Sequence, residues 1–188
     1  NCAATTNEDV PVDLAGDMPT TCTSNYLLTV TSTTEIDDSK SPGGYGIKSV
    51  DIGGPGENII IASSNLNNNF TSGSGTSFAT PLVTGAVTLI YSYPCKAWAD
   101  LIYVDPAKAA CIAKQAILEG VDRNNSLAGK TVSGGRLNIS KSIDWLQHNI
   151  CEANLQSRSN QIDHLVITPN PSNGIVNLYA GFNCEGYQ

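Results

Sequence analysis

Charged residues are scarce in this sequence, and basic residues are the scarcest. Ten Lys and Arg stand against 17 Asp and Glu in 188 residues, for a formal net charge of −7. Such a chain is a poor binder of nucleic acid, because Lys and Arg make most contacts to phosphates. No apolar run approaches the roughly 18 residues that a membrane-spanning helix needs. We therefore expect a protein that neither binds nucleic acid nor spans a membrane.

The sequence also lacks a signal-peptide pattern and a CxxC pair. It begins with Asn1, which indicates a mature or cut product. Without CxxC, and with only two His, a zinc site is disfavoured. The six Cys are better explained by disulfides in an oxidising compartment. Cys2 and Cys22 bracket the first loop, and Cys95 and Cys111 bracket an apparent insertion. We expect most of the six to be oxidised, although the sequence leaves their connectivity open.

Short apolar runs and apolar helices alternate along residues 1–149, which predicts an α/β domain with a mostly parallel sheet. Residues 77–91 are apolar nearly all round, so we expect this helix to be buried on every side. Gly85 inside it indicates that another backbone passes close by. The other predicted elements are strands at 26–31, 50–52 and 58–62 and helices at 107–119 and 138–149.

The sequence becomes polar after the predicted helix at 138–149. Residues 150–164 are polar and without periodicity, which is typical of a linker. Residues 165–188 then contain two short β-forming runs around a turn at 169–174. The sequence therefore predicts a second, β-rich piece that continues beyond Gln188.

The residues that carry chemistry lie between Ser72 and Pro81. A glycine-rich stretch precedes Ser77, which lies at the start of the predicted apolar helix. Unpaired amides and a partial positive charge at a helix N-terminus can stabilise an oxyanion that forms when a Ser hydroxyl attacks a carbonyl. The residues alone also permit Ser77 or Thr76 to be a simple helix cap.

The stretch Gly75-Thr76-Ser77-Phe78-Ala79-Thr80-Pro81-Leu82-Val83-Thr84-Gly85-Ala86 resembles the catalytic serine motif of the subtilases, Gly-Thr-Ser-Met-Ala-x-Pro-His-Val-x-Gly. The stretches at 41–59 and 126–138 resemble the family's motifs before and after it. The resemblance covers about residues 1–149. It implies the C-terminal part of a subtilisin-like three-layer domain. An α/β-hydrolase is excluded, because Gly75 to Ala79 is not GxSxG.

The resemblance implies that Ser77 is the nucleophile. It also implies an Asn side chain as second donor to the oxyanion. Asn1 is preferred, because Asn7-Glu8-Asp9 resembles an Asn-x-Asp that follows the catalytic Asn in bacterial subtilases. Asn7 is the alternative, since its spacing to Tyr26 is closer to the family's. Phe78 replaces the usual Met, and Leu82, which we expect to pack, replaces the usual His.

The family's catalytic Asp and His precede the Ser, whereas both histidines of this chain, His148 and His164, follow it. We expect His148 to be a surface residue. The resemblance therefore implies that an N-terminal part of the same protein supplies Asp and His, and that this chain alone is inactive. We expect no cofactor. Asp51 lies where some subtilases bind a weak cation, but one carboxylate makes no calcium site, so we favour a structural role.

The run from Leu165 to Leu178 resembles the opening of a type IX secretion sorting domain, on the strength of its Pro169-Asn170-Pro171 turn. This resemblance implies a small β-sandwich, a secreted or cell-surface bacterial protein, and contact with secretion or cell-surface machinery.

Two functions follow from these residues. The first is a secreted endopeptidase that hydrolyses polypeptide substrates through Ser77. The second is a non-catalytic subtilase remnant that serves as a structural or cell-surface interaction protein.

Overall fold

The computed structural model describes residues 1–34, 36, 40–63 and 69–152. The predicted sorting domain at 165–188 lies outside the described residues, and so does most of the predicted linker.

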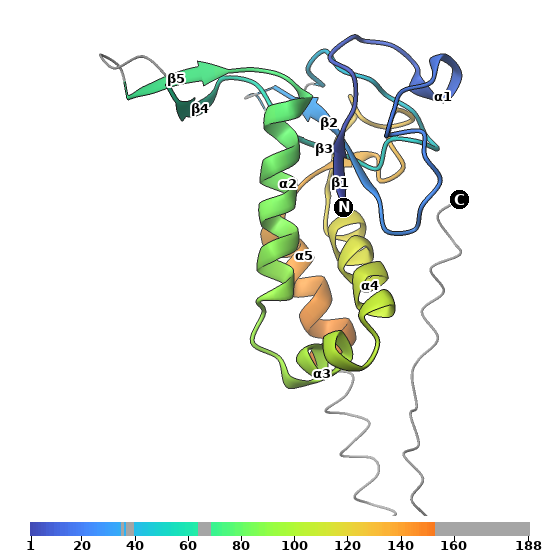
Figure 1. Cartoon of the computed structure of the whole chain (residues 1–188), viewed down its shortest axis with the longest axis vertical. Helices are drawn as coiled ribbons and strands as arrows, with labels where there is room; N and C mark the ends of the chain where they lie inside the picture. The colour runs from blue at the N-terminus through green and yellow to red at the C-terminus, as the bar shows by residue number, and fades with distance from the viewer. Residues whose placement is uncertain (35, 37–39, 64–68, 153–188) are drawn as a thin grey trace, which may run out of the picture.

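A five-stranded sheet forms the centre of the fold (Figure 1). The strands β1, β2, β3 and β7 are parallel, and β6 is antiparallel to β7. This confirms the predicted α/β class and the mostly parallel sheet. In sheet order the strands are β1 (Cys2–Ala4), β2 (Leu28–Thr33), β3 (Ile52–Pro55), β7 (Gly135–Arg136) and β6 (Asp122–Arg123).

Two predicted strands are shifted toward their C-terminal ends. The strand predicted at 50–52 is β3, which begins only at Ile52 and continues through Gly53 and Gly54 to Pro55, and the strand predicted at 26–31 is β2, at 28–33. Both glycines are needed for packing. A Cβ on Gly53 would lie 2.6 Å from Leu127 Cδ1, and one on Gly54 would lie 3.3 Å from the carbonyl oxygen of Ala79. Neighbouring elements therefore approach β3 closely on both faces.

The predicted strand at 58–62 does not join the parallel sheet, which corrects that expectation. It is β4 (Ile59–Ala62), and it pairs antiparallel with β5 (Phe70–Gly73) in a separate two-stranded ribbon. This ribbon projects from the N-terminal end of α2 (Figure 1), and we call it the arm.

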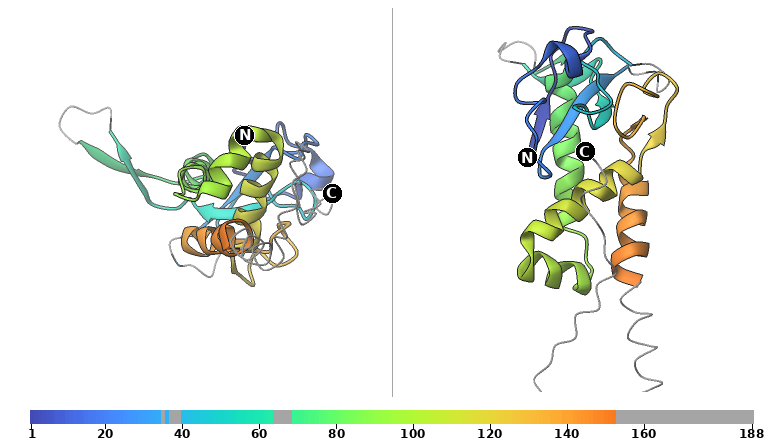
Figure 2. Two further views of the ribbon diagram at one scale, coloured as in Figure 1. Left: turned by 90° about the horizontal axis from the view of Figure 1, so that it is seen from below. Right: turned by 90° about the vertical axis from the view of Figure 1, so that its right-hand side faces the viewer.

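Five α-helices and one π-helical segment complete the described chain. Helix α2 lies along β1, β2 and β3, and α4 and α5 pack beside it (Figure 2). The predicted helix at 107–119 is α4, whereas that at 138–149 ends as an α-helix at Leu146 and continues as a π-helix to Glu152. Residues 150–152, which the sequence assigned to the linker, are therefore helical. The helices are α1 (Val12–Ala15), α2 (Thr76–Tyr91), α3 (Lys96–Val104), α4 (Pro106–Glu119), α5 (Ile139–Leu146) and η1 (Gln147–Glu152).

Helix α2 is buried on one side only, which corrects the expectation of burial all round. Ala79, Val83 and Ile90 are fully buried against the sheet and its neighbouring helices. On the other side Leu82 is 40% exposed and Leu89 is 49% exposed. Nothing in the described chain lies within 4 Å of a Cβ added to Gly85, so the expected neighbouring backbone is not found there.

One disulfide joins Cys95, before α3, to Cys151 in η1. It ties the insertion after α2 to the end of the domain, whereas the sequence pointed to Cys95 and Cys111. Cys2, Cys22 and Cys111 are not in disulfides, so two of the five described cysteines are oxidised rather than most of them. Cys184 lies outside the described residues. The spacing of the cysteines in the sequence could not indicate this pairing. Cys151 comes close to Cys95 only because the chain of α5 and η1 runs back to the start of α3.

Candidate active site

Ser77 is the second residue of α2, at the carboxyl edge of the parallel sheet. The amide of Gly75 donates to the carbonyl of Gly56, directly after β3, over 2.7 Å. Ser77 is exposed, and within the described residues its amide has no hydrogen-bond acceptor. Its N–H therefore adds to the partial positive charge at the start of the helix.

Gly75, the N-cap of α2, is a position that other residues would strain. Its φ is +143°, a backbone conformation that L side chains rarely adopt. A Cβ there would also lie 2.9 Å from Oδ1 of Asn7. Glycine at this position lets the Asn7 side chain approach the first turn of the helix.

The side chain of Asn7 caps α2 from outside the helix. Its Oδ1 accepts a hydrogen bond of 2.9 Å from the amide of Thr76. An amide N–H can only donate, so the atom that faces Thr76 must be the oxygen, and the Asn7 NH2 group points elsewhere. Asn7 is exposed. A donor group is therefore held beside the residue that precedes Ser77.

Thr76 connects this cap to the sheet. The residue is buried, and its Oγ1 lies 2.5 Å from the carbonyl oxygen of Thr5 and 2.9 Å from Oδ1 of Asn7. Thr5 in turn donates its amide to the carbonyl of Val30 in β2 over 3.1 Å. The start of α2, the Asn7 side chain and the edge of the sheet are thus bound into one network.

The loop that carries Asn7 is held on both sides of it. The amide of Thr6 donates to Oδ2 of Asp17 over 2.9 Å, and Lys40 Nζ lies 2.6 Å from Oδ1 of Asp9. The Lys40 hydrogen bond holds the pKa of Asp9 below its usual value. The roles of Asp17 and Lys40, and the contact of Thr76 with Asn7, were not found from the sequence, because no local pattern marks contacts between residues so far apart in the chain.

Asn1, the residue that the sequence favoured as oxyanion donor, lies at the opposite end of β1. Its ammonium group donates to the carbonyl of Tyr26 over 2.9 Å, and its own carbonyl accepts from Leu28 over 2.8 Å. Because β1 and β2 are parallel, this is the amino edge of the sheet. The structure brings Asn7, and not Asn1, to the helix that begins with Thr76 and Ser77.

His148 lies in η1, far from Ser77 along the molecule. It is exposed, as expected, and its Nδ1 lies 2.7 Å from the carbonyl oxygen of Asp144. That contact, together with the charge of Glu152, raises the pKa of His148 above its usual value. The neighbouring Cys151 is bound to Cys95 beyond the C-terminal end of α2. A helix of 16 residues spans about 24 Å, so His148 does not reach Ser77. His164 lies outside the described residues.

Asp51 has the structural role that its position before β3 indicated. Its Oδ2 accepts from the amide and the hydroxyl of Thr29, at 2.8 and 3.0 Å, and lies 3.0 Å from Nζ of Lys114 in α4. Lys114 also donates to the carbonyl of Leu27 over 2.6 Å. An ammonium group thus provides the positive charge beside this carboxylate.

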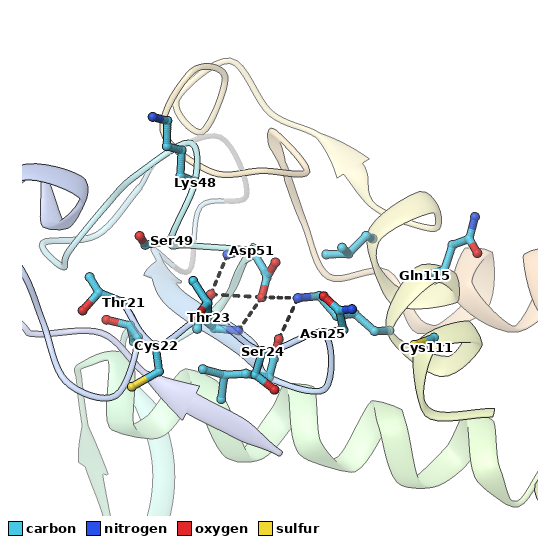
Figure 3. Close-up of a pocket in the computed structure, with 15 residues that line it drawn as sticks. Thr21, Cys22, Thr23, Ser24, Asn25, Lys48, Ser49, Asp51, Cys111 and Gln115 are labelled. Carbon is cyan, nitrogen blue, oxygen red and sulfur yellow. Dashed lines mark hydrogen bonds and ion pairs between the residues drawn. The ribbon is translucent and has the colours of Figure 1, made fainter. Parts of the chain in front are cut away.

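Asp51 and Lys114 line a cleft of about 730 Å³ at the amino edge of the sheet (Figure 3). Hydroxyl-bearing residues from the loop before β2 form much of its wall. The cleft lies at the end of the parallel strands opposite to Ser77, so it is separate from the candidate active site. In the described ranges no three His, Cys, Asp or Glu gather into a metal-binding group. None of the described helices is long and apolar enough to cross a membrane.

A serine at the start of a helix, beside an asparagine amide at the carboxyl edge of a parallel sheet, is an arrangement suited to acyl transfer. The comparison with protein families names the class. Residues 2–149 match the model of the Subtilase family, so the chain belongs to the subtilase family. No curated protein sequence matches the chain.

Solved structures of subtilase-like proteases share the fold. The prenylagaramide maturation protease PagA is 25% identical, over 76% of this chain and 49% of its own, with a TM-score of 0.55. A subtilase cytotoxin SubAB structure is 22% identical over 85% of this chain and 51% of its own, with a TM-score of 0.58. The epidermin leader peptide processing protease EpiP of Staphylococcus aureus is 22% identical, over 76% of this chain and 39% of its own, with a TM-score of 0.56. The chain thus spans between 39% and 51% of the length of these proteins.

Proposed function

We propose that this chain is the C-terminal part of the catalytic domain of a subtilisin-like serine endopeptidase that hydrolyses polypeptides. Ser77 Oγ attacks the carbonyl carbon of the scissile peptide bond. A His in an N-terminal part of the protein accepts the hydroxyl proton, and an Asp from the same part orients that His. Both are outside this chain, so the chain alone is inactive.

The observation that carries this proposal is the hydrogen bond from the amide of Thr76 to Oδ1 of Asn7. It supports Asn7, the alternative from the sequence, as second oxyanion donor in place of Asn1. The first donor is the amide of Ser77, whose N–H has no acceptor in the described part of the chain. Two donors beside one nucleophile can stabilise the negative oxygen of the tetrahedral intermediate.

We also propose that the protein is secreted or held at a bacterial cell surface. The Cys95–Cys151 disulfide supports an oxidising compartment. The Pro169-Asn170-Pro171 turn supports a type IX sorting domain that starts near Leu165. Secretion of the full-length protein by a type IX-competent host should stop when residues from 165 onward are removed. Unchanged secretion would contradict this part of the proposal.

Peptide hydrolysis by the full-length protein tests the enzymatic role. Ser77→Ala should remove nearly all activity, because the neighbouring hydroxyl of Thr76 is buried and bonded to the carbonyl of Thr5 and cannot replace it. Ser72→Ala, on the exposed arm, is the matched control and should retain full activity. A correctly folded full-length protein that cleaves no peptide would instead support a non-catalytic remnant with a structural or cell-surface role.

A further inference from the structure

The carboxylate of Asp17 is bonded to the main chain directly before Asn7. Its Oδ2 accepts a hydrogen bond of 2.9 Å from the amide of Thr6. The carbonyl of Thr6, which belongs to the peptide group that leads into Asn7, accepts from the amide of Gly44 over 2.9 Å. Peptide groups are planar, so these two bonds fix the direction in which the chain enters Asn7.

Asn7 depends on its neighbours for this support. The residue is exposed, and within the described residues its own amide and carbonyl make no hydrogen bond. On its C-terminal side the chain is held by the ion pair of Asp9 with Lys40, in which Asp9 is 62% exposed. An ion pair with one partner largely in water contributes little. The bond from Thr6 to Asp17 is partly buried and thus better protected from water.

The position of Asp17 is set by the turn that follows it. The carbonyl of Asp17 accepts from the amide and the hydroxyl of Thr21, at 2.8 and 2.7 Å. Its Oδ2 also accepts from the hydroxyl of Thr20 over 2.7 Å, and Thr20 is only 2% exposed. The carboxylate that holds Thr6 is thus anchored to a buried side chain.

We infer that Asp17 is a positioning residue for the oxyanion donor. Its carboxylate holds the main chain at Thr6 and thereby keeps the side chain of Asn7 in place beside α2. This inference rests on the proposed function, and Asp17 acts through Asn7 and not on the reacting atoms. The oxyanion exists only in the transition state and the intermediate, so loss of this support should lower kcat and leave KM little changed.

Asp13 provides a matched control in the same loop. Its Oδ1 accepts from the amide of Ser49 over 2.9 Å, and its Oδ2 accepts from the amide of Lys48 over 3.1 Å. Asp13 and Asp17 are both partly buried. The two amides that Asp13 binds precede β3 and do not adjoin Asn7. Asp13→Ala therefore removes two carboxylate–amide bonds without loosening the chain at Asn7.

Steady-state peptide hydrolysis by the full-length protein tests the inference. Asp17→Ala should lower kcat by about 10-fold to 100-fold with KM little changed, because small displacements of a catalytic group are costly. Asp17→Asn keeps an oxygen that can accept both bonds and should restore most of kcat. Asp13→Ala should stay close to wild type. Equal kcat values for Asp17→Ala and Asp13→Ala would overturn the inference.

The same substitution in an Asn7→Ala protein separates positioning from a general loss of stability. If Asp17 acts through Asn7, adding Asp17→Ala to Asn7→Ala should lower kcat by no more than about 2-fold. Equal losses with and without Asn7, in folded protein, would overturn the inference and leave the proposed function intact. An Asn7→Ala protein with the kcat of wild type would contradict the oxyanion role of Asn7 and the inference with it.

Thr20→Val is the second variant, for use if Asp17→Ala does not fold. It nearly preserves the shape of a buried side chain and removes the hydroxyl that anchors Asp17. Thr20→Val should lower kcat when Asn7 is present and have no effect in an Asn7→Ala protein. An equal loss in both proteins, or no loss in either, would overturn the inference.

Discussion

Asn7 and Thr76 are 69 residues apart in the chain, and the Oδ1 atom of Asn7 accepts a hydrogen bond of 2.9 Å from the amide of Thr76. This bond fixes which end of the Asn7 side chain faces the helix. The carbonyl oxygen is turned toward Thr76 at the start of α2, so the NH2 group does not face the amide of Thr76.

Asn7→Ala in the full-length protein should lower kcat by about 10²–10³-fold with KM little changed, as removal of one such donor does in subtilisin. The effect falls on kcat because the oxyanion exists only in the transition state and the intermediate. Steady-state hydrolysis of a peptide substrate measures both constants. Asn1→Ala is the control and should leave kcat within a few-fold of wild type. A large loss of kcat in Asn1→Ala together with an unchanged kcat in Asn7→Ala would show that Asn1 is the second oxyanion donor.

Thr76→Val should also lower kcat, although Thr76 does not touch the substrate. The change removes the hydroxyl that contacts the Thr5 carbonyl and Asn7, and it leaves the Thr5 carbonyl without that partner. Thr76→Ser keeps the hydroxyl and should restore most of kcat. If Val and Ser variants show equal kcat values, the hydroxyl does not position Asn7.

The position of Ser77 near the start of a helix could be predicted from local sequence. Ser77 and its helix lie in one continuous stretch, so the glycine-rich motif and the apolar run located the start of the helix within one residue. The choice between Asn1 and Asn7 could not be made this way. It depends on the parallel register in which Cys2 pairs with Leu28, and β1 has only three residues, too few to form a recognisable pattern.

The prediction that α2 is buried on every side was wrong, and the reason lies in what an apolar pattern can predict. An apolar pattern all round a helix predicts contacts on all sides, but it does not say which part of the protein makes them. The described residues cover one side, and Leu82, Gly85 and Leu89 stay uncovered. The sequence also missed β5 and α3, since the polar strand Phe70–Gly73 and the short helix after Cys95 lack a clear periodicity.

The pair of Lys114 and Asp51 should be required for stability. Their side chains are 18% and 9% exposed and lie 3.0 Å apart. Lys114→Met would leave a buried carboxylate without its charge partner, which costs about 3–5 kcal/mol of unfolding free energy. Urea denaturation of the full-length protein measures this loss.

The double variant Asp51→Asn and Lys114→Met is the control for that measurement. It removes both charges, so it should recover part of the stability that Lys114→Met loses. A Lys114→Met protein as stable as wild type would show that the pair contributes nothing measurable.

Loss of the Cys95–Cys151 disulfide should lower stability without affecting the active-site geometry. The bond closes a segment of 56 residues, for which chain entropy gives about 4 kcal/mol. A full-length protein with Cys95→Ser and Cys151→Ser should unfold at a lower temperature under oxidising conditions and match the reduced wild type. Cys22→Ser, at an exposed thiol outside any disulfide, is the control and should leave Tm unchanged.

The most direct test of the central claim is covalent labelling by a serine-directed phosphonate, mapped by mass spectrometry. In the full-length protein the phosphonate should label Ser77 stoichiometrically. The 188-residue chain and the full-length Ser77→Ala variant should remain unlabelled, because a Ser hydroxyl without an adjacent base is a weak nucleophile. Labelling at a different serine, or none in folded and otherwise intact full-length protein, would contradict the assignment of Ser77 as the nucleophile.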